Sequence, residues 1–136
     1  MKQQLYFFDV IAFLIMAAVL WVTMPASPRF YAGMALTAVS FVFWIVARLQ
    51  LGASFAIAAR AHKLVTTGLY SRFRNPVYLF AQIAYLGLAI AWGRAVGYIV
   101  LVVMAIGQWT RAKKEEAVLE RAFGDEYRSY KSRTLF

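Results

Sequence analysis

Cysteine is absent from this sequence, histidine occurs once and proline three times. The absence of cysteine excludes disulfides, thiolate metal ligands and a cysteine nucleophile. Acidic residues are scarce too, six in all, and five of them follow residue 114. The chain has no histidine pair, no metal-binding acidic box and no phosphate-binding glycine loop, so metal catalysis and nucleotide hydrolysis lack their usual residues. We therefore expect no metal site.

Charged residues make up 15% of the chain and hydrophobic residues 62%, whereas soluble domains carry about 25% charged residues. A soluble domain of this length cannot hide so much apolar surface, so lipid must cover part of it. The net charge of +9 then indicates cations that flank membrane spans and face anionic lipid. Aromatic residues lie inside the apolar runs and not among the basic residues, which argues against nucleic-acid binding.

Four apolar runs have about the length that a helix needs to cross a bilayer core of roughly 30 Å. They occupy residues 5–24, 30–49, 77–92 and 95–109. A cleaved signal peptide is the alternative for the first run, but Asp9, a single lysine and the length of the run argue against it. We predict an all-α, multi-pass membrane helical bundle that forms one domain over residues 1–136.

The third and fourth runs form a helical hairpin, because only Gly93 and Arg94 separate them. Pro76 fits the first turn of the third helix, where its missing N–H costs nothing. Three glycines of the hairpin are expected to allow close approach between helices. They are Gly87, Gly97 and Gly107.

Lysine and arginine are distributed unevenly about the four runs, with 13 of the 15 on one side and only Arg29 and Arg94 on the other. By the positive-inside rule, this bias places both termini and the loop of residues 60–78 in the cytoplasm. We expect an integral, multi-pass protein of a prokaryotic cytoplasmic membrane.

A more polar segment follows the fourth run, and residues 111–123 have helical periodicity. The expected apolar face consists of Val118, Leu119, Ala122 and Phe123. Gly124 is expected to cap this helix. Arg111 and Glu115 project onto the centre of the apolar face and Glu116 onto its edge. We predict an amphipathic cytoplasmic helix whose glutamates point toward the protein; a solvated pair balanced by neighbouring cations is the alternative.

The loop of residues 60–78 holds much of the remaining polar chemistry. His62 can act as a general base at its ordinary pKa near 6.5, or simply make a capping hydrogen bond. Arg74, beside a helix start, can hold an anion or merely satisfy the charge bias. Tyr70 and Tyr78 are either site residues or interfacial aromatics. The residues alone leave these alternatives open.

Three motifs of the chain resemble those of the isoprenylcysteine carboxyl methyltransferase-like family of integral membrane methyltransferases, relatives of the phospholipid N-methyltransferases. Those proteins carry H-x-L-V-x-x-G-P-Y, then R-H-P-x-Y, then a helical hairpin and E-E-x-x-L-x-x-x-F-G-x-E-Y-x-x-Y. The corresponding segments here are residues 62–70, 74–78 and 115–130. Leu69 replaces the proline of the first motif, and Asn75 replaces the histidine of the second.

The resemblance implies S-adenosylmethionine as methyl donor, bound between the loop and the C-terminal helix. The implied donor-binding residues are His62, Leu64, Val65, Gly68, Tyr70, Asn75, Pro76, Tyr78, Glu115 and Glu116. The implied catalytic residues are Arg74, Asn75 and Glu116, with Arg74 orienting an anionic acceptor or the carboxylate of the donor. Sulfonium methyl transfer is an in-line displacement, for which positioning and desolvation can carry much of the catalysis.

The resemblance also implies a lipophilic acceptor, an isoprenylcysteine carboxylate or a similar molecule, that reaches the site from the bilayer. We expect Phe80, Tyr85 and Trp92 to lie along its route. Membrane lipids and this acceptor are the expected partners, and no nucleic acid. The alternatives are a phospholipid N-methyltransferase and a non-catalytic small membrane protein of transport or assembly.

Overall fold

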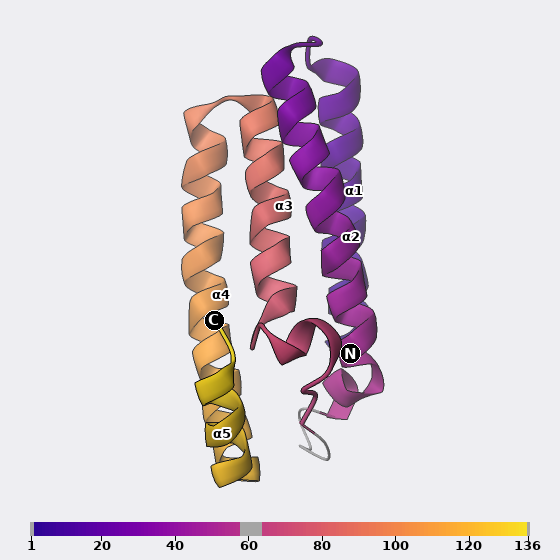
Figure 1. The fold of residues 1–136 in the computed structure, drawn as a ribbon. Helices are drawn as coiled ribbons and strands as arrows, with labels where there is room; N and C mark the ends of the chain where they lie inside the picture. The colour runs from indigo at the N-terminus through magenta and orange to yellow at the C-terminus, as the bar shows by residue number, and fades with distance from the viewer. Residues whose placement is uncertain (1, 58–63, 136) are drawn as a thin grey trace.

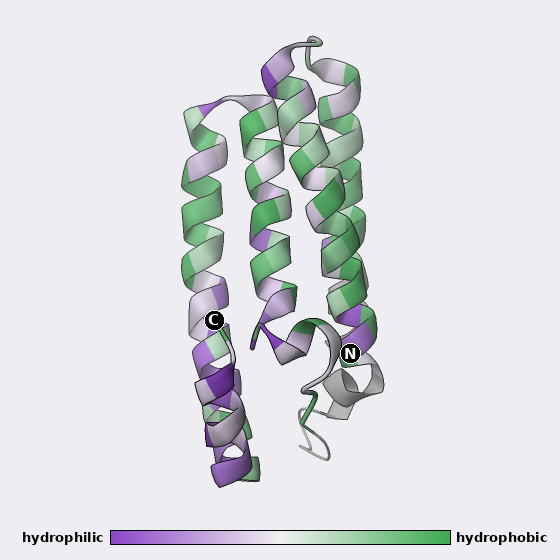
Figure 2. Cartoon of the chain, viewed as in Figure 1, coloured by the Kyte–Doolittle hydropathy of each residue, from purple (hydrophilic) through white to green (hydrophobic). Residues whose placement is uncertain are grey.

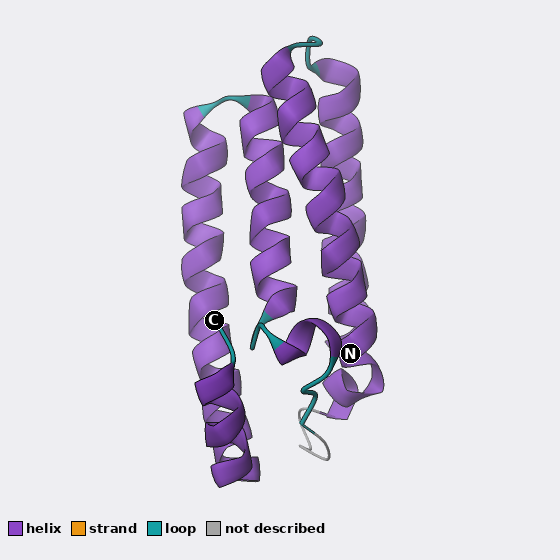
Figure 3. Ribbon diagram, viewed as in Figure 1, coloured by secondary structure: helices purple, strands orange, loops and turns teal. Residues whose placement is uncertain are grey.

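The computed structural model describes the backbone of residues 2–57 and 64–135, and the side chains of residues 8–52 and 64–135 within these ranges. This part of the chain is all-α and contains no strand, as Figures 1 and 3 show. The elements are α1 (Lys2–Thr23), α2 (Pro28–Ile57), the 3₁₀ helix η2 (Gly68–Ser71), α3 (Pro76–Trp92), α4 (Ala95–Phe123) and α5 (Asp125–Arg133). The prediction of an all-α membrane bundle is confirmed.

Apolar and polar residues separate along the bundle. Two helical stretches are long and apolar enough to cross a bilayer, Pro28–Gly52 and Ala95–Phe123, and two shorter apolar helices lie beside them, Phe8–Thr23 and Pro76–Trp92. Hydrophilic residues gather over α5, the adjoining part of α4 and the start of α3 (Figure 2). We call this region, residues 68–78 and 111–135, the polar end.

Helices α2 and α3 form the closest helix pair, because small residues face each other where they cross. A Cβ atom added to Gly33 would lie 2.5 Å from the carbonyl oxygen of Gly87, and one added to Gly87 would lie 2.6 Å from the carbonyl oxygen of Gly33. The Thr37 hydroxyl donates to the carbonyls of Gly33 and, across the pair, Ala84, at 2.9 and 3.2 Å. The expected role of Gly87 is confirmed.

The other two hairpin glycines differ from Gly87. A Cβ atom on Gly97 would meet the Trp92 ring at 3.1 Å, a tight contact within the hairpin. A Cβ atom on Gly107 would have no neighbour within 4 Å, so the expected close approach at Gly107 is wrong. Gly107 is exposed, on a face of α4 that points away from α3.

Aromatic rings fill the space between α1, α2 and α3. Phe13 is buried and contacts the rings of Phe41 and Tyr85 at 5.3 and 5.0 Å between centroids. Phe80 stacks on Phe43 of α2 at 5.0 Å. Trp92 packs against the same core. All three side chains remain half-buried, and their expected place along the route of the acceptor stays a prediction.

The turn between α3 and α4 is as short as predicted. Gly93 ends α3 with a left-handed backbone (φ 66°), and Arg94 is the N-cap residue before α4. Helix α4 then runs to Phe123 without a break, so the predicted helix of residues 111–123 is its continuation. Gly124, with φ 52°, ends it as expected.

The inward face of the second half of α4 differs from the predicted one. Ala112 and Glu116 are buried and Leu119 is half-buried, whereas Val118 and Ala122 are exposed. Arg111 is exposed too, against expectation. Helix α4 is continuous, so the rotation of its first half also fixes the rotation of its second half. The face of the first half that packs on α3 therefore determines which residues of the second half point inward. The predicted inward placement of the glutamates is confirmed, since Glu115 is half-buried and Glu116 is 7% exposed.

Candidate functional site

Helix α5, which the sequence did not lead us to expect, folds back beside α4 (Figure 1). Two of its tyrosines contact the loop before α3. Tyr127 and Tyr130, three residues apart on one helical face, are 1% and 5% exposed and pack with Leu64. The Tyr130 hydroxyl donates to the carbonyl oxygen of Tyr70 at 2.7 Å. Burial raises the pKa of Tyr127 and of Tyr130 to about 12, so both hydroxyls keep their protons at neutral pH.

The residues after α5 bind the same loop through their backbone. The Leu135 N–H donates to the Arg72 carbonyl at 2.7 Å, and the Arg74 N–H donates to the Leu135 carbonyl at 3.0 Å. Phe73 and Leu135 thereby form a parallel bridge. These bonds fix the backbone from which the Arg74 side chain extends.

Glu116 is the buried carboxylate of the polar end, and three cations surround it. Arg74 Nη1 lies 3.7 Å from Oε1, while the Nζ atoms of Lys113 and Lys131 lie 3.4 and 3.3 Å from Oε2. Burial by itself raises the pKa of Glu116, but the charges of Arg74, Lys131 and Lys113 outweigh it, and the net pKa is lowered. Glu116 is therefore ionised at neutral pH.

Glu115, the preceding residue, pairs with α3 instead. The Tyr78 hydroxyl donates to Glu115 Oε1 at 2.8 Å. Tyr78 lies in the first turn of α3, which Pro76 begins, and Pro76 is fully buried. The two consecutive glutamates thus face two different partners, Tyr78 for Glu115 and the cation cluster for Glu116.

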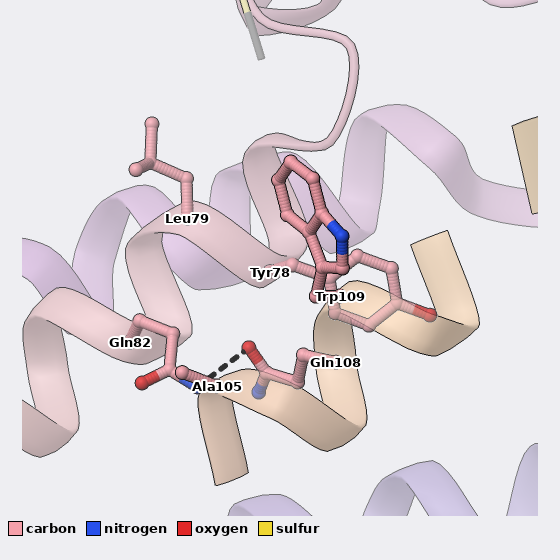
Figure 4. A pocket seen from close by; sticks show the side chains of 6 residues that line it. All are labelled: Tyr78, Leu79, Gln82, Ala105, Gln108 and Trp109. Atoms are coloured by element: carbon pink, nitrogen blue, oxygen red, sulfur yellow. Dashed lines mark hydrogen bonds between the residues drawn. The ribbon is translucent and has the colours of Figure 1, made fainter. Parts of the chain in front are cut away.

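A pocket opens between α3 and α4 next to Tyr78. Its volume is about 210 Å³, and it is lined by Tyr78, Leu79, Gln82, Ala105, Gln108 and Trp109 (Figure 4). Gln82 Nε2 donates to Gln108 Oε1 at 2.9 Å across the two helices. Tyr78 lines this pocket and also contacts Glu115, so it adjoins both the pocket and the glutamates.

The remaining predicted residues lie around this centre. Leu64 and Tyr70 are buried under α5, and Val65 is half-buried. Gly68 begins η2 with a left-handed backbone (φ 64°), where a side chain would be strained. Asn75 precedes α3 and makes no side-chain cap hydrogen bond. His62 lies outside the described residues.

Several members of the site were not assigned from the sequence. Lys131 holds Glu116, Tyr130 holds the loop, and Gln82 pairs with Gln108. Lys113, which also pairs with Glu116, is one of the neighbouring cations that the alternative reading of the glutamates expected. One signal was available: two tyrosines three residues apart, followed by Lys131, after a helix-ending glycine indicate another helix with one aromatic face. The pairing of Gln82 with Gln108 needs the relative rotation of two helices, which one sequence does not supply.

The fold and the site together define an integral membrane helical bundle with a cluster of glutamate, arginine and tyrosine side chains at one end. Comparison with known families matches residues 28–126 to the phospholipid methyltransferase family, and the chain belongs to that family. The resemblance to integral membrane methyltransferases is thereby confirmed, because the isoprenylcysteine carboxyl methyltransferases are of the same group. Neither a curated protein nor a solved structure matches the chain.

Proposed function

We propose that this protein transfers a methyl group from S-adenosylmethionine to a lipophilic acceptor that enters from the bilayer. Membership of a methyltransferase family supports methyl transfer and, in general, this donor. The observation that carries the proposal is the assembly of Arg74, Tyr78, Glu115 and Glu116 at one end of an apolar bundle. A site at that place can receive a soluble donor from water and an acceptor from lipid.

The residues of the polar end fit the polar groups of the donor. When bound, the donor supplies a methyl group on a positively charged sulfur, which leaves as a neutral thioether. Arg74 Nε is buried and has no hydrogen-bond partner among the described residues, so it offers a hydrogen bond to the donor's carboxylate. Glu115 can accept from ribose hydroxyls or an ammonium group. The rings of Tyr70 and Tyr78 suit a cationic sulfur nearby.

Positioning is the main task of these side chains, because an in-line displacement depends on alignment and exclusion of water. We assign Glu116 to hold Arg74 in place through the 3.7 Å ion pair. We assign Asn75 to orient a ligand at the start of α3, since its amide donates and accepts hydrogen bonds but takes no proton at neutral pH. Leu64, Val65, Gly68, Tyr70, Pro76 and, outside the described residues, His62 would shape the wall of the donor site.

We place the polar end in the cytoplasm, where the donor is available. The support is the distribution of lysine and arginine, 13 of 15 on that side of the predicted spans. Reporter fusions after Leu135 and within residues 66–72 should both report cytoplasm, and a fusion at Arg94 should report the opposite side. A C-terminal reporter outside the cytoplasm would overturn this placement.

The deciding experiment uses S-adenosylmethionine with a labelled methyl group, the purified protein and a membrane extract. We expect label in a lipid-soluble product, which mass spectrometry then identifies. Calorimetric titration should show that Glu116→Gln weakens donor binding about ten- to a hundredfold, the effect of losing one charge-assisted hydrogen bond. Glu126→Gln, an exposed carboxylate on α5, is the matched control. The absence of both donor binding and label transfer would overturn the proposal.

A phospholipid N-methyltransferase is the second candidate, and the family match favours it. The cluster of Arg74, Lys113, Lys131, Glu115 and Glu116 has three cations and two carboxylates, and this excess of positive charge is attractive to a phosphate. Phosphatidylethanolamine and a long-chain amine without phosphate would separate the candidates. Methylation of phosphatidylethanolamine at a much lower concentration than the simple amine would favour the phospholipid acceptor.

A further inference from the structure

Two amide side chains meet inside the apolar part of the bundle. Gln82 lies one helical turn beyond Tyr78, about 6 Å deeper along α3. Gln108 lies two turns before Glu115 on α4, and Gln82 donates to it at 2.9 Å (Figure 4). Polar side chains at membrane depth are costly and mark functional sites by default. A bond that only joins two helices is the simpler explanation.

The pocket beside the pair distinguishes these explanations. A pair that only joins helices needs no open space, yet about 210 Å³ lies between Gln82, Gln108 and the small side chain of Ala105. Pockets that enclose a drug-sized ligand measure about 300–1,000 Å³. This one therefore has room for a head group, while the alkyl chain of an amphiphile stays in the bilayer. Trp109 lines the pocket and is half-exposed.

The amides leave hydrogen-bonding capacity for such a head group. One bond between two glutamines uses one N–H and one oxygen lone pair, and leaves an oxygen on one partner and an NH₂ group on the other. This holds whichever way each amide is oriented. The pair can thus accept a hydrogen bond from a ligand and donate one to it.

The lack of charged residues in the pocket limits which head groups can bind there. None of the six lining residues is charged. A carboxylate there would lose its hydration without gaining a cation, and it has no hydrogen to give to the amide oxygen. An amine in its free-base form, a hydroxyl or a thiol has a hydrogen to donate to the amide oxygen and a lone pair to accept from the NH₂ group.

We propose that Gln82 and Gln108 form the acceptor-head site, which selects amphiphiles with an uncharged, hydrogen-donating head and disfavours carboxylates. The role as acceptor site rests on the proposed function; the binding itself does not. Tyr78 lines this pocket and bonds to Glu115, so a head group held by the amides lies beside the glutamates that we assign to the donor.

The test measures binding by photolabelling in phosphatidylcholine nanodiscs. The probe is a sixteen-carbon alcohol with a diazirine on the chain next to the hydroxyl. We expect label on peptides containing Leu79, Ala105 or Trp109. Hexadecanol and hexadecanethiol should compete at least about tenfold better than hexadecanoic acid. Label elsewhere, or equal competition by the acid, would overturn the proposal.

Variants make the test specific to the amides. The double variant Gln82→Leu, Gln108→Leu should lose about tenfold in labelling, the factor that one ordinary hydrogen bond supports. Val103→Leu, on a 64% exposed position of α4, is the control and should label like the wild type. Circular dichroism against temperature checks the fold, and Gln82→Asn, which keeps an amide on a shorter arm, should lose labelling severalfold. Unchanged labelling in the double variant would contradict the inference.

The two proposals fail in different ways. If labelling follows the amides but no methyl group is transferred from the donor, the head-group site stands and the methyltransferase function fails. If transfer proceeds with the same acceptor KM in the wild type and in the double variant, the function stands and the acceptor site is overturned.

Discussion

Tyr78 and Glu115 are 37 residues apart in the sequence, and their side chains meet at 2.8 Å. Both lie where apolar helices become polar, Tyr78 in the first turn of α3 and Glu115 beyond the apolar part of α4. The hairpin that turns at Gly93 brings them together, because α4 runs back to the end of the bundle where α3 begins. The bond therefore reports the register of α3 against α4.

A double-mutant cycle measures this bond. Tyr78→Phe and Glu115→Ala should couple by about 1.5–3 kcal/mol in the free energy of unfolding, the range for a hydrogen bond to a charged group. Denaturant unfolding of the protein in mixed micelles gives the four values. Tyr98→Phe, on the first half of α4, should be additive with Glu115→Ala. Additivity of the Tyr78 pair would show that the bond contributes nothing.

The lowered pKa of Glu116 predicts that the stability of the protein depends on pH under acidic conditions. Its folded-state pKa is lowered from the usual 4.5, burial being outweighed by Arg74, Lys131 and Lys113. Its contribution to stability is therefore present above pH 4.5 and is lost as the pH falls through the folded-state pKa. Thermal unfolding should show a loss of stability below about pH 4.5 that is smaller in Glu116→Gln. Glu126→Gln should retain the wild-type profile, and parallel profiles for Glu116→Gln and the wild type would contradict the lowered pKa.

Tyr130 should control the order of the loop before α3. Tyr130→Phe keeps the ring that packs with Tyr127 and removes the hydroxyl that bonds to the Tyr70 carbonyl. We expect amide hydrogen exchange in residues 69–74 to rise about two- to tenfold, which corresponds to one neutral hydrogen bond. Tyr31→Phe, at a 54% exposed position, should leave this exchange unchanged. Equal rates in both variants would mean that packing alone holds the loop.

Gly87 and Gly107 should respond in opposite directions to alanine. Gly87→Ala forces a methyl group against the backbone of Gly33 and should destabilise the protein by about 1–3 kcal/mol. Gly107→Ala meets no atom within 4 Å and should be neutral or stabilising by up to about 1 kcal/mol, because alanine is the better helix former. Denaturant unfolding measures both. A destabilising Gly107→Ala would indicate a partner for that face of α4.

The bundle could be predicted from the sequence because lipid makes hydrophobicity and length nearly sufficient for identifying helices. Pro76 and Gly93 marked the ends of α3 for local reasons, a missing donor and a left-handed backbone. The rotation of the second half of α4 was harder to predict. The projected apolar face included Val118 and Ala122, and both are exposed. Rotation depends on which face of α4 packs on α3, and that is a tertiary property.

The site was predicted unevenly for the same reason. The motif around Arg74, Tyr78 and the two glutamates was found because its members are close together in two short segments. Lys131 and Tyr130 reach the same place from α5, a short helix of polar composition that the sequence analysis did not assign. The partners of Glu116 therefore could not be identified before the fold was known.

The backbone bridge between Phe73 and Leu135 can form only after Leu135 has been synthesised. The Tyr70 carbonyl accepts a hydrogen bond from the Tyr130 hydroxyl, and Tyr130 is synthesised 60 residues later. At about 5–20 residues per second, a ribosome needs roughly 3–12 seconds to make that stretch. During this interval α1, α2 and α3 can already lie in the bilayer while the polar end is incomplete. The contacts of the polar end are therefore complete only after α5 has been made, later than the apolar helices that carry the loop.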